Sequence, residues 1–137
     1  GHSERRIDFS ETSEMVAQKA QLLLENAITP IICLDTPYLD DQIKSLYSLN
    51  IDVSRCFFVY EPISAIGSGK ATDPVSTGHV ANQISFLLDN SAPVLYGGSI
   101  TGDNVDSFLA QPQINGVLVG TDSLDPTLFA DIINKIN

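Results

Sequence analysis

The chain has 137 residues and a formal net charge of −10. That length suffices for one domain with a buried core. The negative charge repels nucleic acid and anionic membranes, so neither is an expected partner, and any anionic ligand requires a local positive potential at its site.

Helix-like and strand-like segments alternate along the chain. The first helix should be capped by Thr12 or Ser10, and a later one should begin at Pro74 with Asp73 as its cap. Such alternation predicts a parallel sheet with right-handed crossovers, although periodicity alone does not separate an open doubly wound sheet from part of a barrel. The expected elements are a leading loop, helix 13–26, strand 28–34, helix 40–49, strand 55–60, helix 74–88, strand 94–96, helix 102–109, strand 117–120 and helix 126–136.

The two cysteines, Cys33 and Cys56, lie in apolar, strand-like runs and lack metal-ligand spacing. Buried free thiols are the expected state, which favours a cytoplasmic protein over a disulfide-bonded one. No apolar run approaches the roughly 18 residues of a membrane helix, and no signal peptide is recognisable.

Residues 60–70, of sequence YEPISAIGSGK, carry the strongest functional signal. A hydrophobic strand ends at Tyr60, the lone carboxylate of Glu61 follows, and a proline and a Gly-x-Gly-Lys loop come next. An α/β barrel keeps its chemistry on such residues at the carboxyl ends of its strands. An ordinary turn after an acid is the alternative. A nucleotide P-loop does not fit, because Ser64 and Ala71 replace its first glycine and its final hydroxyl residue.

Four segments in order resemble the triosephosphate isomerase family: the opening GHSERR, the YEPISAIGSGK segment, YGGSI at 96–100 and GVLVG at 116–120. The resemblance implies a (β/α)8 TIM barrel. Residues 1–137 would be the C-terminal part of that single domain, namely the loop after strand four and the four following strand–helix units. A closed barrel typically needs about 200 residues or more, so a missing N-terminal half is expected as a partner.

The resemblance also implies a role for each motif residue. Glu61 would be the catalytic base, His2 the neutral electrophile at the substrate oxygen, and Glu4 a buried acid beside the histidine. The other implied roles are phosphate binding by the backbone of Gly67, Ser99, Gly120 and Thr121, an apolar clamp of Ile66 and Leu118 over the carboxylate, and closure of the lid by Tyr96.

Some of these residues also have a plainer interpretation. The run Glu4-Arg5-Arg6 reads equally as solvated surface charge, although Arg5 matches a structural arginine of the family. Ile66 and Leu118 could simply belong to the core. His79, the other histidine, has no motif around it and is expected to be structural or exposed.

The reaction implied by the resemblance is the interconversion of D-glyceraldehyde 3-phosphate and dihydroxyacetone phosphate through an enediolate, in glycolysis and gluconeogenesis. It uses no metal and no cofactor, and the complete enzyme would be a cytoplasmic homodimer whose small-molecule partners are triose phosphates. One alternative is a non-catalytic half-barrel that binds phosphate or assembles with the missing N-terminal half. Another is a different phosphate-binding barrel enzyme.

The sequence departs from the family pattern at three positions. Ser64 stands where the lid normally has a tryptophan, and Thr36 stands where the family places that tryptophan's glutamate partner. Both partners of one contact are therefore replaced, which predicts a different anchor for the open lid. Thr121 replaces a glycine of the phosphate turn, and because a β-branched residue enters positive φ only at a cost, phosphate affinity is in question.

Overall fold

The computed structural model describes residues 1–67 and 69–136. Four parallel strands form one sheet in the order β1-β2-β3-β4, as the alternating pattern predicts. The strands are β1 (Ile31–Leu34), β2 (Phe57–Tyr60), β3 (Val94–Gly97) and β4 (Gly116–Leu118). The helices are α1 (Ser3–Phe9), α2 (Ser13–Glu25), α3 (Leu39–Ser48), α4 (Pro74–Leu87), α5 (Val105–Leu109) and α6 (Pro126–Ile136), with 3-10 turns η1 (Thr36–Tyr38), η2 (Val53–Arg55), η3 (Ile63–Ala65) and η4 (Thr121–Leu124) between them.

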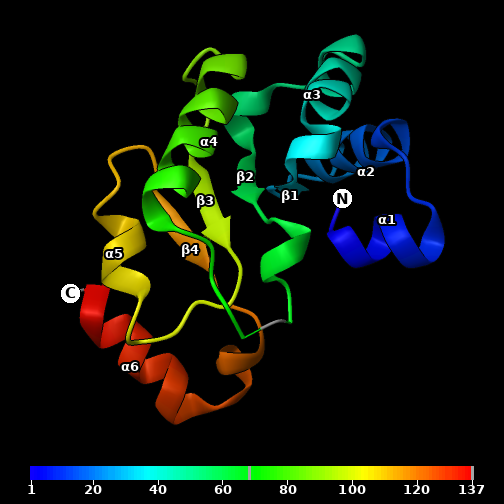
Figure 1. Cartoon of the computed structure of the whole chain (residues 1–137). Helices are drawn as coiled ribbons and strands as arrows, with labels where there is room; N and C mark the ends of the chain where they lie inside the picture. The colour runs from blue at the N-terminus through cyan, green and yellow to red at the C-terminus, as the bar shows by residue number, and fades with distance from the viewer. Residues whose placement is uncertain (68, 137) are drawn as a thin grey trace.

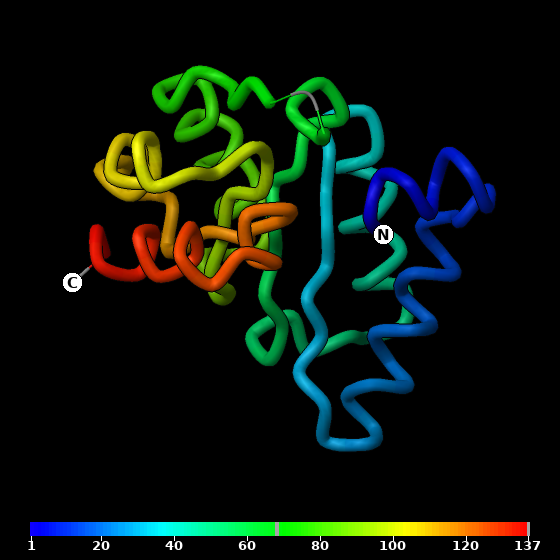
Figure 2. Tube along the Cα trace, turned by 90° about the horizontal axis from the view of Figure 1, so that it is seen from below, coloured from blue at the N-terminus to red at the C-terminus, as the bar shows by residue number. Residues whose placement is uncertain are grey.

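The helices flank an open sheet. Helix α4 packs on β2 and β3, and α5 packs on β4, while α2 and α3 pack together near β1 (Figure 1). Figure 2 shows α2 running alongside β1 and the two termini lying on opposite sides of the molecule. This is the α/β architecture of part of a TIM barrel, and within the described residues the barrel is not closed.

The register of the sheet brings the carboxyl ends of its strands together. Leu34 pairs with Tyr60, Tyr60 with Tyr96, and Gly97 with Leu118. The loops that follow the four strands therefore leave the sheet at one edge, where α/β barrels place their active sites.

The core lies between the sheet and its helices. Tyr96 and Phe108 are almost fully buried, and their rings stack with centroids 4.2 Å apart. Phe58 is equally buried on β2. Because burying one large apolar side chain contributes roughly 1.5–3 kcal/mol, these residues fix β3 against α5 and the neighbouring strand.

The predicted helix caps are confirmed. Thr12 accepts a hydrogen bond from the Met15 N–H at 3.3 Å, and Asp73 accepts one from the Ser76 N–H at 2.8 Å. Helix α4 begins at Pro74, as predicted. Each cap bonds to a residue three positions further along the chain, so the residue types around each helix start were sufficient to predict it.

The predicted start of the first strand was wrong. Residues 28 and 29 do not join the sheet, because Ala27 is left-handed with φ 58° and the Ile28 N–H donates to the Leu23 carbonyl, closing α2. Pro30 has no N–H to give to a strand ladder, and only its carbonyl takes part, accepting from the Phe57 N–H at 2.9 Å. The strand therefore begins at Ile31, and Ile28 serves the end of a helix.

The expected leading loop is largely helical. Its first turn is capped by the His2 side chain, which accepts from the Glu4 N–H, and Ser10 ends the helix in the left-handed region with φ 51°.

The predicted start of the helix after β3 was also wrong, because α5 begins at Val105 and not at 102. The Asn104 side chain accepts from the Thr101 N–H at 3.0 Å and so forms a turn before the helix.

Apolar side chains are exposed on β1 and in the connection that follows β4. Ile31 of β1 is 59 % exposed, and Leu124, in the connection that follows β4, is 84 % exposed. Within the described ranges, β1 and β4 each pair on one side only.

No helix among residues 1–67 and 69–136 is both long enough and apolar enough to cross a membrane.

Candidate active site

A cavity of about 600 Å³ opens at the carboxyl ends of the strands. Every predicted site residue except Tyr96 contributes to its wall, although these residues come from four separate segments of the chain. The wall consists of His2, Glu4, Glu61, Ile66, Gly67, Gly69, Gly98, Ser99, Ile100, Thr101, Leu118, Gly120, Thr121 and Asp122.

Glu61 lies at the point where β2 ends and the next loop begins. Its N–H donates to the Leu34 carbonyl at 2.8 Å, which continues the ladder one residue beyond the strand. Its side chain is only 7 % exposed, and Oε1 lies 3.1 Å from His2 Nε2. Oε2 is buried and has no hydrogen-bond partner in the described part of the chain. An unpaired buried acceptor is costly, and such groups in native structures commonly have a chemical role.

The geometry of His2 fixes the position of its proton. Nδ1 accepts a hydrogen bond from the Glu4 N–H at 3.3 Å, so Nδ1 carries no proton in that arrangement. The neutral imidazole then carries its proton on Nε2, the nitrogen that faces Glu61. A hydrogen-bond donor and a carboxylate therefore meet at the cavity wall.

Glu4 lies in the cavity wall but is not buried. Its side chain is 71 % exposed, and Oε2 lies 3.9 Å from His2 Nδ1. The implied buried position was wrong for this structure, because the first turn of α1 lies at the rim of the cavity. The backbone N–H of Glu4, and not its carboxylate, makes the close contact with the histidine.

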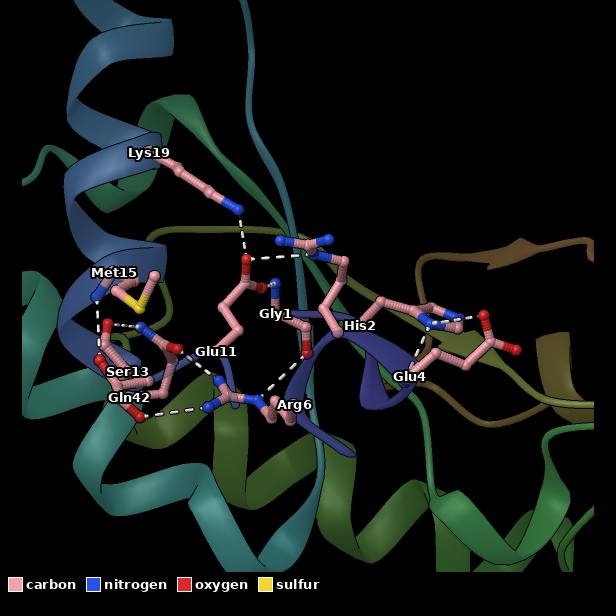
Figure 3. A network of polar contacts seen from close by, with 11 residues as sticks. Gly1, His2, Glu4, Arg6, Glu11, Ser13, Met15, Lys19 and Gln42 are labelled. Carbon is pink, nitrogen blue, oxygen red and sulfur yellow. Dashed lines mark hydrogen bonds and ion pairs between the residues drawn. The ribbon is translucent and has the colours of Figure 1, made fainter. Parts of the chain in front are cut away.

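A polar network fastens the His2 segment to α2 and α3 (Figure 3). Arg6 donates to Gln42 Oε1 at 2.6 Å and to the Gly1 carbonyl at 3.2 Å. Gln42 is fully buried and donates to the Ser13 carbonyl at 3.1 Å. The interpretation of Arg6 as solvated surface charge was therefore wrong, since its guanidinium joins three parts of the chain.

The second half of this network centres on Glu11. Its buried carboxylate accepts from the Gly1 amino group at 2.6 Å, from Arg5 Nε at 3.4 Å and from Lys19 Nζ. Burial opposes ionisation of Glu11, but the hydrogen bond from Lys19 and the positive charge around the carboxylate outweigh it and hold the pKa below its ordinary value of 4.5. The folded state therefore holds Glu11 as a carboxylate.

We expect Glu11 to make the stability of the fold sensitive to acid. A carboxyl whose pKa is lowered on folding stabilises the fold above about pH 4.5, and that contribution is lost as the pH falls from 4.5 towards 2. Glu11→Gln should lower the stability at pH 6 and flatten its loss in acid, as measured by urea unfolding between pH 3 and 6. Glu25→Gln, at the end of α2, is the control. Parallel pH curves for Glu11→Gln and the unsubstituted protein would contradict this assignment.

Ser99 and Tyr96 contact the loop that follows Glu61. Ser99 Oγ donates to the Ala65 carbonyl at 2.8 Å, and the Thr72 N–H donates to the Tyr96 hydroxyl at 3.2 Å. Gly98 makes this approach possible, because a Cβ there would lie 2.9 Å from Ala65 Cβ. The predicted lid, residues 62–70, is thus held at Ala65 by the loop after β3, and the chain just beyond it is held at Thr72 by Tyr96 of β3 itself. Ser68 of the lid lies outside the described residues.

The predicted phosphate turn is less strained than expected. Gly120 and Thr121 line the cavity opposite the lid residue Gly67. Thr121 is not among the residues with positive φ, and it begins η4. The expected backbone cost of a β-branched residue therefore does not arise there.

Three neighbours of the site were missed from the sequence. Burial, and then the adjacent Glu61 carboxylate, raise the pKa of the Cys33 thiol to about 12, so it stays protonated beside the base. Ser3 Oγ donates to the Glu61 carbonyl at 3.5 Å. Asp122 lines the cavity next to the phosphate turn. Only Asp122 had a sequence signal, since an acid directly after that turn is unfavourable for an anion.

We expect Asp122 to weaken phosphate binding through like-charge repulsion. Asp122→Asn should tighten binding of inorganic phosphate up to about fivefold at low salt, and high salt should remove the difference. Calorimetric titration at two salt concentrations measures both effects. Asp125→Asn is the matched control, because Asp125 caps α6 through the Thr127 N–H at 2.8 Å and does not line the cavity. Equal affinities for the two variants would refute the repulsion.

A parallel sheet, helical crossovers and a cavity at the carboxyl ends of the strands together define the chain as part of an α/β barrel with an enzyme-type site. The family model described as triosephosphate isomerase matches residues 1–136, and the chain belongs to this family.

Curated relatives named triosephosphate isomerase agree with this membership. The chain is 39 % identical to the protein from Nostoc sp., with 99 % of this chain and 61 % of the relative covered. It is 38 % identical to that of Mycoplasmoides gallisepticum, with 97 % and 61 % covered. A Synechococcus protein is 39 % identical, with 98 % and 57 % covered. The chain thus spans about three fifths of the length of the curated relatives it matches.

Proposed function

We propose that this chain, completed by the part of the family barrel that it does not span, interconverts D-glyceraldehyde 3-phosphate and dihydroxyacetone phosphate. The whole is called the completed barrel below. The observation that carries the proposal is the arrangement of Glu61 and His2 in one cavity: the buried Oε2 of Glu61 has no partner among the described residues, and its Oε1 lies 3.1 Å from His2 Nε2. Base and electrophile are the two groups that this isomerisation requires.

In the proposed reaction, Glu61 takes a proton from the carbon beside the substrate carbonyl. The His2 Nε2–H donates a hydrogen bond to the carbonyl oxygen, which becomes the oxyanion of an enediolate. The proton then returns to the neighbouring carbon, and a hydroxyl proton moves between the two oxygens. The net change is a shift of protons along one carbon–carbon pair, so no redox cofactor or metal enters these steps.

The phosphate of the substrate would be held by backbone amides. Gly67, Ser99, Gly120 and Thr121 face one cavity, and none of the described residues in its wall is a lysine or an arginine. Clustered N–H groups bind anions without a cationic side chain, which suits a chain with a net charge of −10. Ile66 and Leu118, also in the wall, would cover the carboxylate and exclude water.

The biological setting belongs to the same proposal. The completed barrel would act in glycolysis and gluconeogenesis, in the cytoplasm, as a homodimer. The second candidate, a non-catalytic half-barrel that binds phosphate, rests on the two unpaired margins of the sheet. A coupled assay of triose phosphate interconversion in both directions distinguishes the two. Turnover by the completed barrel supports the isomerase, whereas phosphate binding without turnover supports the binding module.

A further inference from the structure

Asp35 links the end of β1 to the beginning of the lid. It directly follows the last residue of the strand and is only 8 % exposed. Its Oδ2 accepts from the Ile63 N–H at 3.1 Å, while Oδ1 accepts from the Thr36 N–H at 2.7 Å. Each carboxylate oxygen therefore holds a different loop.

The hydrogen bonds that the end of β1 accepts lie on both sides of the Glu61 side chain in the sequence. On one side of it, the Glu61 N–H donates to the Leu34 carbonyl at 2.8 Å. On the other side, two residues later, the Ile63 N–H donates to the Asp35 carboxylate. Two consecutive residues at the end of β1 thus hold the backbone before and after the proposed base.

A simple helix cap does not account for this arrangement. Asp35 caps η1 through Oδ1 alone, and an exposed serine or asparagine serves such a cap equally well. Asp52 provides the comparison, because it caps η2 through Oδ1, accepts from the Ser54 N–H at 3.2 Å, and is exposed. Burying a carboxylate is costly, and the additional charge-assisted bond to the lid offsets that cost at Asp35.

The remaining contacts of this loop come from β3 and the loop that follows it. Ser99 contacts Ala65, and Tyr96 contacts Thr72. Without the bond from Asp35, the segment between Glu61 and Ala65 would lose its contact with the end of β1.

We propose that Asp35 is a positioning residue: its carboxylate fixes the start of the lid, and through Ile63 it orients Glu61 and keeps the lid shut over the reaction intermediate. This inference rests on the proposed isomerase function. It assigns Asp35 no contact with the substrate, so its effect should appear in turnover and in leakage of the intermediate more than in substrate binding.

Leakage has a chemical readout. If the lid opens while the enediolate is bound, the electron pair of the enediolate forms a new carbon–carbon double bond and the carbon–oxygen bond to the phosphate breaks. Inorganic phosphate leaves with the bonding pair, and the remaining enol moves its hydroxyl proton to carbon and becomes methylglyoxal. The experiment compares the completed barrel with its Asp35→Asn and Asp52→Asn variants. Asp35→Asn can keep the cap through its amide oxygen, but it presents an N–H₂ group to the Ile63 N–H.

For Asp35→Asn we expect kcat to fall about 10-fold to 100-fold, with KM changed by less than about threefold. Inorganic phosphate released per isomerisation should rise at least about tenfold, because the lid opens earlier. Asp52→Asn should match the unsubstituted protein in all three quantities, since it changes only an exposed cap that does not line the cavity. An Asp35→Asn variant that behaves like Asp52→Asn would overturn the proposal.

Amide hydrogen exchange at Ile63 tests the same link without turnover. In the unsubstituted completed barrel, exchange should be slowed by at least about 100-fold relative to an unstructured peptide. Unprotected exchange would overturn the proposal, even if Asp35→Asn fails to fold. Absence of isomerase activity in the unsubstituted protein would instead refute the proposed function, while protection at Ile63 that disappears in Asp35→Asn would still establish the anchor.

Discussion

Glu61→Gln should lower kcat of the completed barrel by about 10³-fold or more in both directions of the reaction. The amide has nearly the shape of the carboxylate, and its oxygen can still accept from His2 Nε2. It cannot take a proton from carbon, so the change removes the base and preserves the cavity. Steady-state kinetics with each triose phosphate measures the loss.

Phosphate binding gives the matching control for that experiment. Three of the four proposed phosphate contacts, Ser99, Gly120 and Thr121, come from the backbone of loops other than the one that follows Glu61, and the fourth, Gly67, lies six residues beyond it. The Kd for inorganic phosphate should therefore change by less than about threefold in Glu61→Gln. Glu25→Gln, at the end of α2 and away from the cavity, should leave kcat unchanged. Turnover of Glu61→Gln within a few-fold of the unsubstituted protein would remove Glu61 from the role of base.

The parts of the site that could be predicted from the sequence are those encoded in short, local motifs. Glu61 follows a strand, Ser99 follows a double glycine, and Gly120 ends a short apolar run. Each motif fixes where a loop leaves the sheet, and parallel strands bring such loops to one edge. That is why residues from separate motifs meet in one cavity. Their chemical roles remain predictions.

The missed parts depend on contacts between segments that are distant in sequence. The bond from Asp35 to Ile63 joins loops after two different strands, and no spacing rule predicts it. Cys33 lies beside Glu61 only because β1 pairs with β2 in one particular register. The prediction that Glu4 is buried was wrong for a related reason. A local motif identifies the residue type, but it does not say which other segments pack over the helix that carries the residue.

The two unpaired edges of the sheet lead to a second prediction, which concerns the activity and the association state of the isolated chain. The isolated chain of residues 1–137 should have no measurable isomerase activity and should self-associate. β1 and β4 each pair on one side only within the described residues, and Ile31 and Leu124 are 59 % and 84 % exposed. Unpaired strand edges next to exposed apolar side chains readily pair with other chains.

Catalysis should be lost for a separate, electrostatic reason. None of the described residues in the cavity wall is a lysine or an arginine, and the chain carries a net charge of −10. An enediolate that develops negative charge there would lack a cationic partner, and such a contact is often worth about 3–4 kcal/mol at an oxyanion. We expect a cationic side chain to come from the part of the family barrel that the chain does not span.

Recombination tests both reasons together. The isolated chain is assayed for triose phosphate interconversion and sized by light scattering, before and after addition of the remaining family segment as a separate polypeptide. We expect addition to convert aggregates into a defined assembly and to restore turnover in parallel, because one interface both covers the sheet margins and completes the site. The same mixture with Glu61→Gln in the chain should assemble without turning over. Robust turnover by residues 1–137 alone would show that the second segment is dispensable and that the cavity described above is already a complete active site.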